Sequence, residues 1–461
     1  MKIKIRNLGI LKTAEFEIGE LTIICGKNNT GKTYAVYAFY GFLRLWRSII
    51  SFESLDKYSK ELIDLGVTRI ELEDFKKRIP DFLQKACKEY SKFLYKIFAS
   101  SENFFDGSVF QLELDTSRLN LNEKFKKTIR FGKKDLIVCS KDENSSILEI
   151  AGLQEKGDDP IPAYAIEQFI NDTLLDILFA PLFPNQFIAS AERTGAAIFR
   201  RELNFARNRL LEEMSGMERD LDPFKLLDSV YDSYALPVKD NVDLTRDFEN
   251  IAKRESFIVK KYPHILDNFH DVIGGEYKVV RGELYYIPHK GRVKLTMDES
   301  SSAVRSLLDI GFYIKHIAKP GDMFIVDEPE LNLHPKNQRR IARLFVSLIN
   351  IGIKIFITTH SDYIIKELNT LIMLNDSTDH SIKVMKKYGY GENELLSPQQ
   401  VRVYYAGKSL VKLQGNQKKT KSFTFIPCNI DPGLGIEVKG FDESIIEMNQ
   451  IQEDILFGGD K

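Results

Sequence analysis

The sequence predicts an α/β protein whose core is a mainly parallel β-sheet. The first observation is a continuous apolar or β-branched run, Leu21–Cys25, which stops at Gly26 and is followed by helical spacing from Lys32. Such a run is typical of a strand that is buried on both faces. The second observation is that helix and strand patterns alternate from Ser302 onward. This alternation predicts parallel strands covered by helices.

In chain order, residues 1–50 predict the N-terminal part of the sheet domain, with two strands and a helix. Residues 51–270 predict a mostly helical insertion, with a β segment near residues 108–151 where short β-like runs alternate with Gly, Asn, Asp and Ser. Residues 271–375 predict the C-terminal part of the same domain. Residues 376–461 predict further short strands and a final helix.

The composition is that of a globular protein. Apolar residues make up 43% of the 461, and 65 Lys and Arg nearly balance 66 Asp and Glu. This balance argues against a chain held on nucleic acid by its overall charge, although it allows local basic patches. No apolar run reaches the ~20 residues of a membrane span. The four cysteines form no metal or disulfide pattern, and the start is no signal peptide. We therefore expect a cytoplasmic protein with no membrane partner.

The loop after the first buried strand carries a phosphate-binding pattern. Residues 26–33 read Gly-Lys-Asn-Asn-Thr-Gly-Lys-Thr and fit G-x-x-x-x-G-K-S/T at every fixed position. Such a loop aims backbone N–H groups into one concavity, Lys32 would reach the β- and γ-phosphates, and Thr33 would hold Mg²⁺. A chance match in an ordinary turn is the alternative, but the strand before and the helix after argue against it. The expected nucleotide-binding residues here are Gly26, Lys27, Asn28, Asn29, Thr30, Gly31, Lys32, Thr33 and Tyr34.

A second predicted strand ends in two carboxylates. Four apolar residues, Met323–Val326, precede Asp327 and Glu328. A buried strand that ends in aspartate places this carboxylate at the carboxyl edge of the sheet, where it can hold Mg²⁺. We therefore predict Thr33 and Asp327 as metal ligands and Glu328 as the general base. Alone, the pattern would equally suit a strand that ends in a solvated acidic turn.

Two further motifs complete the candidate site. His360 follows the next predicted strand, where a sensor of the γ-phosphate would lie, so we predict a catalytic role rather than a purely structural one. Ser300, Ser301 and Ser302 precede a helix predicted over residues 302–317. Serines at this position are N-caps in any case. They could also bind the γ-phosphate of a nucleotide held by another subunit.

In this order, the motifs closely resemble those of the ABC-type ATPases of the structural-maintenance, Rad50, RecF and OLD group, described broadly as AAA-family proteins. The resemblance covers about residues 1–50 and 270–375. It also includes the segment Phe-Ile-Ala-Ser-Ala-Glu-Arg at residues 187–193, which looks like the arginine-bearing element of such ATPases. The resemblance implies an ABC-ATPase head whose cofactors are ATP and Mg²⁺.

The resemblance also implies roles for individual residues. Asp327 would be the Walker B aspartate, Glu328 the catalytic base, residues 331–335 the D-loop and His360 the switch histidine. Two chains would form a homodimer, or part of a higher homo-oligomer, with ATP sandwiched between them.

The signature motif departs from the family pattern. Ser302 and Ala303 stand where the family sequence Leu-Ser-Gly-Gly-Gln has its glycines. The Q-loop glutamine is not assigned, with Gln111 and Gln186 as the two candidates.

Two absences narrow the kind of ATPase. Residues 51–270 lack the sustained heptads of Rad50-like coils, and the part after Ser361 lacks the metal-binding carboxylates of OLD-type nucleases. At the level of architecture, the chain resembles the ATPase subunits of two bacterial anti-phage systems, Septu (PtuA) and PARIS (AriA). The resemblance implies a sensor or scaffold that controls a separate effector nuclease, of HNH type in Septu.

The competing hypothesis is a DNA repair or recombination ATPase of the RecF type that binds DNA directly. It requires a basic surface, and two groups of residues could supply one, although a solvated face is the simpler interpretation of both. A transporter subunit is disfavoured by the altered signature and the large insertion. The basic residues are Lys336, Arg339, Arg340 and Arg343 in one group and Lys408, Lys412, Lys418, Lys419 and Lys421 in the other.

Overall fold

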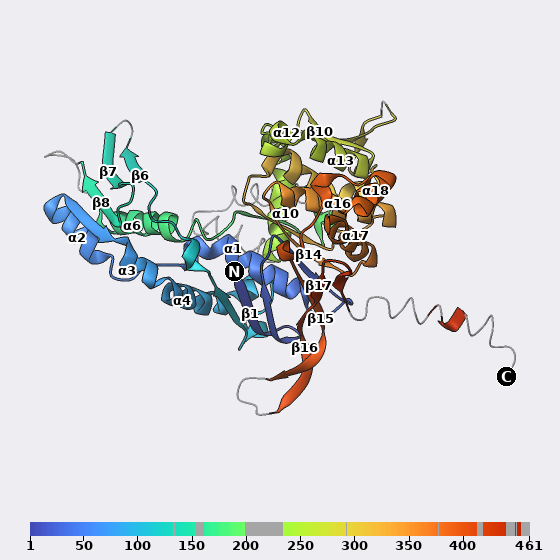
Figure 1. Cartoon of the computed structure of the whole chain (residues 1–461). Helices are drawn as coiled ribbons and strands as arrows, with labels where there is room; N and C mark the ends of the chain where they lie inside the picture. Colours follow the sequence, from blue (N-terminus) through green and yellow to red (C-terminus); the bar gives the residue numbers. More distant parts are fainter. Residues whose placement is uncertain are drawn as a thin grey trace, which may run out of the picture. The chain divides into compact units, whose positions relative to one another are not determined.

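The computed structural model describes residues 1–131, 134–153, 161–198, 234–291, 293–376, 378–412, 418–438, 448 and 450–452 (Figure 1). The chain divides into two compact units. The smaller contains Met1–Lys4, Phe42–Phe93 and Val109–Pro184, and the larger contains Ile5–Gly41, Leu94–Ser108 and Asn185–Lys461.

This division differs from the expected one, because the segment over residues 51–270 is shared between both units. Whether that segment acts as one insertion stays a prediction. The final helix, expected around residues 442–456, falls almost wholly outside the described residues.

The larger unit has an α/β architecture with a mainly parallel sheet, which confirms the predicted fold class. Its strands follow the order β1-β2-β16-β15-β3-β14-β13-β9. Strand β3 pairs in parallel with β14 and β15, and β13 pairs in parallel with β14 and β9, whereas β15 and β16 form an antiparallel hairpin. The strands are β1 (Lys2–Leu8), β2 (Leu11–Glu17), β3 (Leu21–Cys25), β9 (Gln186–Ala189), β13 (Met323–Asp327), β14 (Lys354–Thr359), β15 (Val401–Lys412) and β16 (Lys419–Pro427).

Apolar runs explain why the central strands form. All residues of β3 and β13 are buried, as a strand covered on both faces requires. Helix α16 (Pro335–Asn350) buries Ile341, Phe345 and Leu348 at helical spacing, and Pro335 occupies its first turn.

Other helices of the larger unit include α5 (Leu94–Ile97), α7 (Arg193–Ile198), α10 (Leu236–Arg246), α11 (Phe248–Ile251), α12 (Phe257–Lys261), α13 (Pro263–Ile273), α14 (Ser302–Ser306), α15 (Leu308–Phe312), α17 (Asp362–Met373) and α18 (Asp379–Tyr388). The helix expected over residues 302–317 is thus formed by α14, α15 and a π-helical turn, Tyr313–Ile317. Small strands also belong to this unit: β10 (Gly275–Val280), β11 (Glu283–Pro288), β12 (Leu295–Thr296), β17 (Asn429–Asp431) and β18 (Gly435–Glu437).

The smaller unit contains an antiparallel sheet with the strand order β4-β8-β7-β6. Its core is aromatic: the rings of Phe52 and Phe82 lie edge to face, with centroids 4.9 Å apart. Helix α1 (Lys32–Ile49) begins in the larger unit and ends in this one. The other elements are α2 (Asp56–Leu65), β4 (Val67–Glu71), α3 (Leu72–Lys77), α4 (Ile79–Lys92), β5 (Val109–Glu113), β6 (Phe125–Phe131), β7 (Lys134–Lys141), β8 (Ile147–Gly152) and α6 (Ala163–Leu178).

Within the described ranges, no helix combines the length and apolar character needed to cross a membrane.

Candidate nucleotide-binding site

The glycine loop joins β3 to α1, as the pattern at residues 26–33 predicts. Gly26 has φ +142° and Gly31 has φ +91°, conformations that side chains rarely adopt. A Cβ atom at Gly26 would lie 2.7 Å from the carbonyl oxygen of Ala406, and one at Gly31 would lie 2.6 Å from Leu11 Cγ. Both positions therefore require glycine.

Lys32 begins α1, and its ammonium turns back onto the loop. Its Nζ donates hydrogen bonds to the carbonyl oxygens of Gly26 (3.0 Å) and Lys27 (2.9 Å). Burial lowers the pKa of Lys32, while the carboxylates of Glu328 and Asp327 act in the opposite direction. The loop lysine and the strand-end carboxylates, distant in sequence, thus lie within electrostatic reach of one another.

The side chains of the other predicted loop residues differ in their contacts and exposure. The Thr30 hydroxyl donates to the carbonyl oxygen of Lys27 (2.8 Å), which closes the turn. Lys27, Asn28 and Asn29 have exposed side chains. Tyr34 packs its ring against Phe98, with centroids 5.3 Å apart, so a nucleotide would meet the backbone of Tyr34 rather than its ring.

Asp327 ends β13 and is completely buried. Its Oδ1 accepts a hydrogen bond from the Thr358 hydroxyl at the end of β14, whereas Oδ2 has no partner among the described residues. Burial raises the pKa of Asp327 to about 6, although hydrogen bonds from the Thr358 and Thr33 hydroxyls oppose this shift. An unpartnered buried carboxylate oxygen beside a threonine hydroxyl is a donor set that fits Mg²⁺.

Glu328 follows in a strained conformation, with φ +52°. Its backbone N–H donates to the Thr358 hydroxyl at 3.1 Å, so the same threonine holds both acidic residues. Interaction with His360 lowers the pKa of Glu328, which keeps this carboxylate ionised and able to accept a proton. The pKa values of these adjacent carboxyl groups are therefore shifted in opposite directions, and perturbed pKa values of this kind cluster at functional sites.

His360 follows β14 and lies between two carboxylates. Its Nδ1 is 3.7 Å from Glu328 Oε1 and 3.2 Å from Glu330 Oε1. Glu328, and to a lesser extent Glu330, raise the pKa of His360. Glu330 is nearer, but burial raises its own pKa, so Glu328 is the stronger charged partner.

The Arg193 side chain is only 1% exposed and contacts the backbone beneath the two acidic residues, Asp327 and Glu328. Its guanidinium donates to the carbonyl oxygens of Ser306 (2.6 Å), Asp327 (2.7 Å) and Glu328 (2.9 Å), and of Ser190, also at 2.7 Å. One side chain thus joins the ends of β9, β13 and α14. Asp309, a buried neighbour whose pKa burial raises to about 7, provides a nearby opposite charge.

The predicted signature serines lie at the start of α14. Ser301 caps this helix by accepting a hydrogen bond from the backbone N–H of Val304 (3.3 Å), as expected of an N-cap. The Ser300 hydroxyl donates to the carbonyl oxygen of Thr296 (2.7 Å), and Ser302 is exposed. No contact between these serines and the phosphate loop is recorded in the described part of this single chain.

Sequence reasoning assigned no role to Glu330. Glu330 accepts hydrogen bonds from the Thr359 hydroxyl (2.9 Å) and the His360 backbone N–H (2.7 Å). The third carboxylate of the Asp-Glu-Pro-Glu sequence was the signal available for it. Gln186, one Q-loop candidate, pairs with Met323 at the opposite end of β13, away from the carboxylates. Gln111, the other, lies on β5.

Comparison with known proteins shows that part of the chain matches a sequence family. Residues 157–366 match the sequence family described as "AAA domain, putative AbiEii toxin, Type IV TA system". Over this segment the chain is similar to an AAA domain. The matching segment contains Arg193, Asp327, Glu328 and His360, whereas the phosphate loop lies outside it. No curated protein matches the chain.

Two solved structures are also similar. The SMC head bound to the C-winged helix domain of ScpA is 12% identical, with 92% of this chain and 97% of that chain covered and a TM-score of 0.33. The SMC head domain from Thermotoga maritima is 12% identical, with 93% and 98% covered and a TM-score of 0.29.

Proposed function

We propose that the chain binds ATP with Mg²⁺ and hydrolyses it. The supporting observation is that the buried Lys32 side chain lies within electrostatic reach of the end of β13. At this strand end, Asp327 has one unpartnered oxygen, and the lowered pKa of Glu328 keeps its carboxylate ionised. A phosphate cradle, a metal ligand and a base are the three components that phosphoryl transfer to water requires.

Each component has a defined part in this proposal. The loop N–H groups and Lys32 bind the phosphates, and Asp327 with Thr33 would hold Mg²⁺, which neutralises charge on the phosphate oxygens. Glu328 accepts the proton of the attacking water. His360, whose pKa is raised by its neighbouring glutamates, positions Glu328 and in its protonated form presents positive charge toward the γ-phosphate.

The direct test is ATP hydrolysis by the purified chain, with Mg²⁺ or with excess EDTA. We expect turnover only with Mg²⁺, and strongly reduced turnover for Asp327→Asn, because an amide is a poorer ligand for this hard cation. Asp298→Asn, a change at an exposed carboxylate, is the matched control. Equal hydrolysis in EDTA would exclude the metal site.

We also propose that a complete site requires two chains. Ser300, Ser301 and Ser302 would contact the γ-phosphate of a nucleotide held by the partner's loop, which gives a two-fold homodimer or a higher oligomer built from it. ATP would favour the closed dimer, and hydrolysis would release it. This arrangement rests on the family resemblance and on the exposed start of α14.

Light scattering with and without ATP tests the assembly. Ser301→Arg combined with Ser302→Arg should keep the chain monomeric in ATP, because two bulky charges would occupy the contact. Ser101→Arg combined with Asn103→Arg adds the same charge at exposed positions and should dimerise normally. A wild-type monomer whose ATP turnover per chain does not depend on concentration would contradict the two-chain site.

As a biological role, we propose a sensor or scaffold subunit that controls a separate effector nuclease, HNH-type as in Septu, in an anti-phage complex. The family match points the same way, since its description names a toxin system. The test is phage plating on bacteria that carry the gene with its flanking genes. Lys32→Ala should abolish protection, and equal plaque numbers with and without the wild-type genes would contradict the role.

A further inference from the structure

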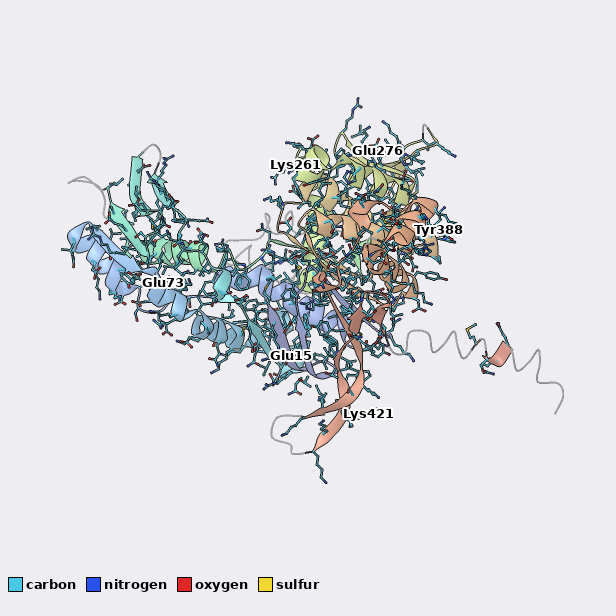
Figure 2. The ribbon with its side chains drawn as sticks, in the orientation of Figure 1. Glu15, Glu73, Lys261, Glu276, Tyr388 and Lys421 are labelled. Atoms are coloured by element: carbon cyan, nitrogen blue, oxygen red, sulfur yellow. The ribbon has the colours of Figure 1, made fainter. Side chains whose placement is uncertain are left out.

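The β15–β16 hairpin extends past the strands on both sides of it. Strand β15 pairs with β3 only over Val401–Tyr405, and β16 pairs with β2 only at Phe423. Beyond Phe423 the ribbon pairs only within itself, from Ser409 with Ser422 to Lys412 with Lys419. Figure 1 shows this two-stranded ribbon reaching beyond the sheet, and Figure 2 labels Lys421 on it.

The register places all lysines of this ribbon on one face. Directly opposed residues and alternate residues along a strand share a face. Lys412 opposes Lys419, Leu410 opposes Lys421, and Lys408 opposes Phe423. One face therefore carries four exposed lysines with Leu410 and Phe423, and we call it the lysine face. The other face is uncharged: Ser409, Val411, Thr420 and Ser422.

Within the described part of the chain, no acidic side chain neutralises this face. No Asp or Glu occurs between Glu394 and Asp431. Among the described residues, no ion pair involves these lysines, and Lys408 contacts only the Phe423 ring, with Nζ 5.0 Å from its centroid. Directly opposed like charges destabilise a strand pair. Lysines often protect an exposed strand from pairing with other chains. This role explains their presence on the ribbon, but not why they gather on one face.

The other basic group behaves differently. On α16, Arg339 forms an ion pair with Glu367 (2.5 Å) and Arg343 with Glu394 (2.6 Å), while Arg340 donates to the carbonyl oxygen of Asp271 (3.2 Å). Two of the four basic side chains of α16 are thus neutralised by carboxylates of the larger unit. The lysines of the hairpin have no such acidic partner among the described residues, so the hairpin is the better candidate for an external anion.

We propose that the lysine face binds the phosphate backbone of double-stranded nucleic acid. A two-stranded ribbon fits the major groove of B-DNA, which is about 12 Å wide. Lys419 and Lys421 are separated along the strand by about 7 Å, so each can reach a different phosphate. Phosphate contacts carry no sequence information, and binding is therefore independent of sequence.

The lysine face is also linked to the glycine loop. Strand β15 passes directly beside this loop, since the Ala406 carbonyl oxygen lies 2.7 Å from where a Cβ atom of Gly26 would be. Lys408 is two residues further along β15. Strand β15 therefore contributes both to the lysine face and to the wall beside the glycine loop. The binding itself does not require the proposed hydrolysis.

The test measures fluorescence anisotropy of labelled 20-base-pair DNA and RNA duplexes with the full chain, without nucleotide, at 50–200 mM salt. Lys412→Gln, Lys419→Gln and Lys421→Gln together should weaken binding to both duplexes by at least about tenfold and reduce the salt slope by about two to three. The same three positions changed to Arg should retain binding.

Lys260→Gln, Lys261→Gln and Lys290→Gln form the matched control, with the same loss of charge at exposed positions (Lys261 is labelled in Figure 2). The control should bind like the wild type. Unchanged melting temperature and basal ATP turnover of the hairpin variant show that it is folded.

Three results would overturn the proposal: no binding of either duplex by the wild type at 50 mM salt, equal binding by the hairpin and control variants, or binding of phosphatidylserine vesicles in preference to both duplexes.

Discussion

The carboxyl end of β13 and the start of α14 are both predicted nucleotide contacts, but the chain satisfies their polar groups to different degrees. At β13, Asp327 Oδ2 and Glu330 Oε2 are buried without a partner among the described residues. At α14, the hydroxyls of Ser300 and Ser301 are already hydrogen-bonded within the chain. A buried polar atom left alone costs about 1–3 kcal/mol. The first region therefore carries an energetic cost that a bound ligand would relieve, whereas the second is already satisfied as a helix cap.

The largest effect should follow removal of the cation that faces the β13 carboxylates. Lys32→Ala is expected to weaken ATP binding at least about 100-fold and to abolish turnover, because in the proposed site this ammonium would contact the β- and γ-phosphates. Nucleotide titration by fluorescence measures the loss. Lys88→Ala is the control, since Lys88 is exposed and lies outside the glycine loop. Wild-type affinity in Lys32→Ala would refute the phosphate loop.

The next effect separates chemistry from binding at the same strand end. Glu328→Gln keeps the shape and loses the base, so turnover should fall by about 10²–10⁴-fold while ATP affinity is retained. Single-turnover hydrolysis and binding are measured side by side. Glu392→Gln, at an exposed glutamate, should leave both unchanged. If turnover survives in Glu328→Gln, the base is another group.

Arg193 connects the two regions, so its removal tests whether they depend on each other. Arg193→Ala leaves four carbonyl oxygens without their donor and should lower the free energy of unfolding by about 3 kcal/mol or more. Arg193→Lys retains the charge but cannot reach all three segment ends. We expect Arg193→Lys to fold and to lose turnover more than ATP affinity. Denaturant titration and steady-state kinetics would contradict this by showing wild-type values for both variants.

The smallest effect concerns His360. His360→Ala should reduce turnover by about 10- to 100-fold, less than Glu328→Gln, since the base itself remains. The raised pKa of His360 also predicts a pH dependence. Its stabilising contribution is complete below the unfolded pKa of about 6.5 and is lost as pH rises through the higher folded pKa.

The difference in unfolding free energy between wild type and His360→Ala should therefore shrink as pH rises above about 6.5. His380→Ala, at an exposed histidine, serves as the control. A difference that grows with pH would contradict the assigned charge of His360.

The parts of the site predicted from sequence are those that local patterns encode. The loop at residues 26–33 and Asp327 at a strand end each follow from a few consecutive residues. Arg193 was noticed in sequence, but its four acceptors come from segments up to 135 residues away, which no spacing reveals. Glu330 was missed for the same reason, because its hydrogen-bond donors lie at the end of β14, about 30 residues away in sequence. The lysine face depends on hairpin register, so sequence alone could place the lysines together but not on one side.

The pairing of β3 has a consequence for folding during synthesis on the ribosome. Cys25, at the end of β3, donates its thiol to the carbonyl oxygen of Tyr404, 379 residues later. At about 5–20 residues per second, a ribosome needs roughly 20 to 80 s between these two positions. During this time one edge of the strand that leads into the loop has no neighbour. The hydrogen bonds that complete this edge of β3, beside the glycine loop, can therefore form only after β15 has left the ribosome.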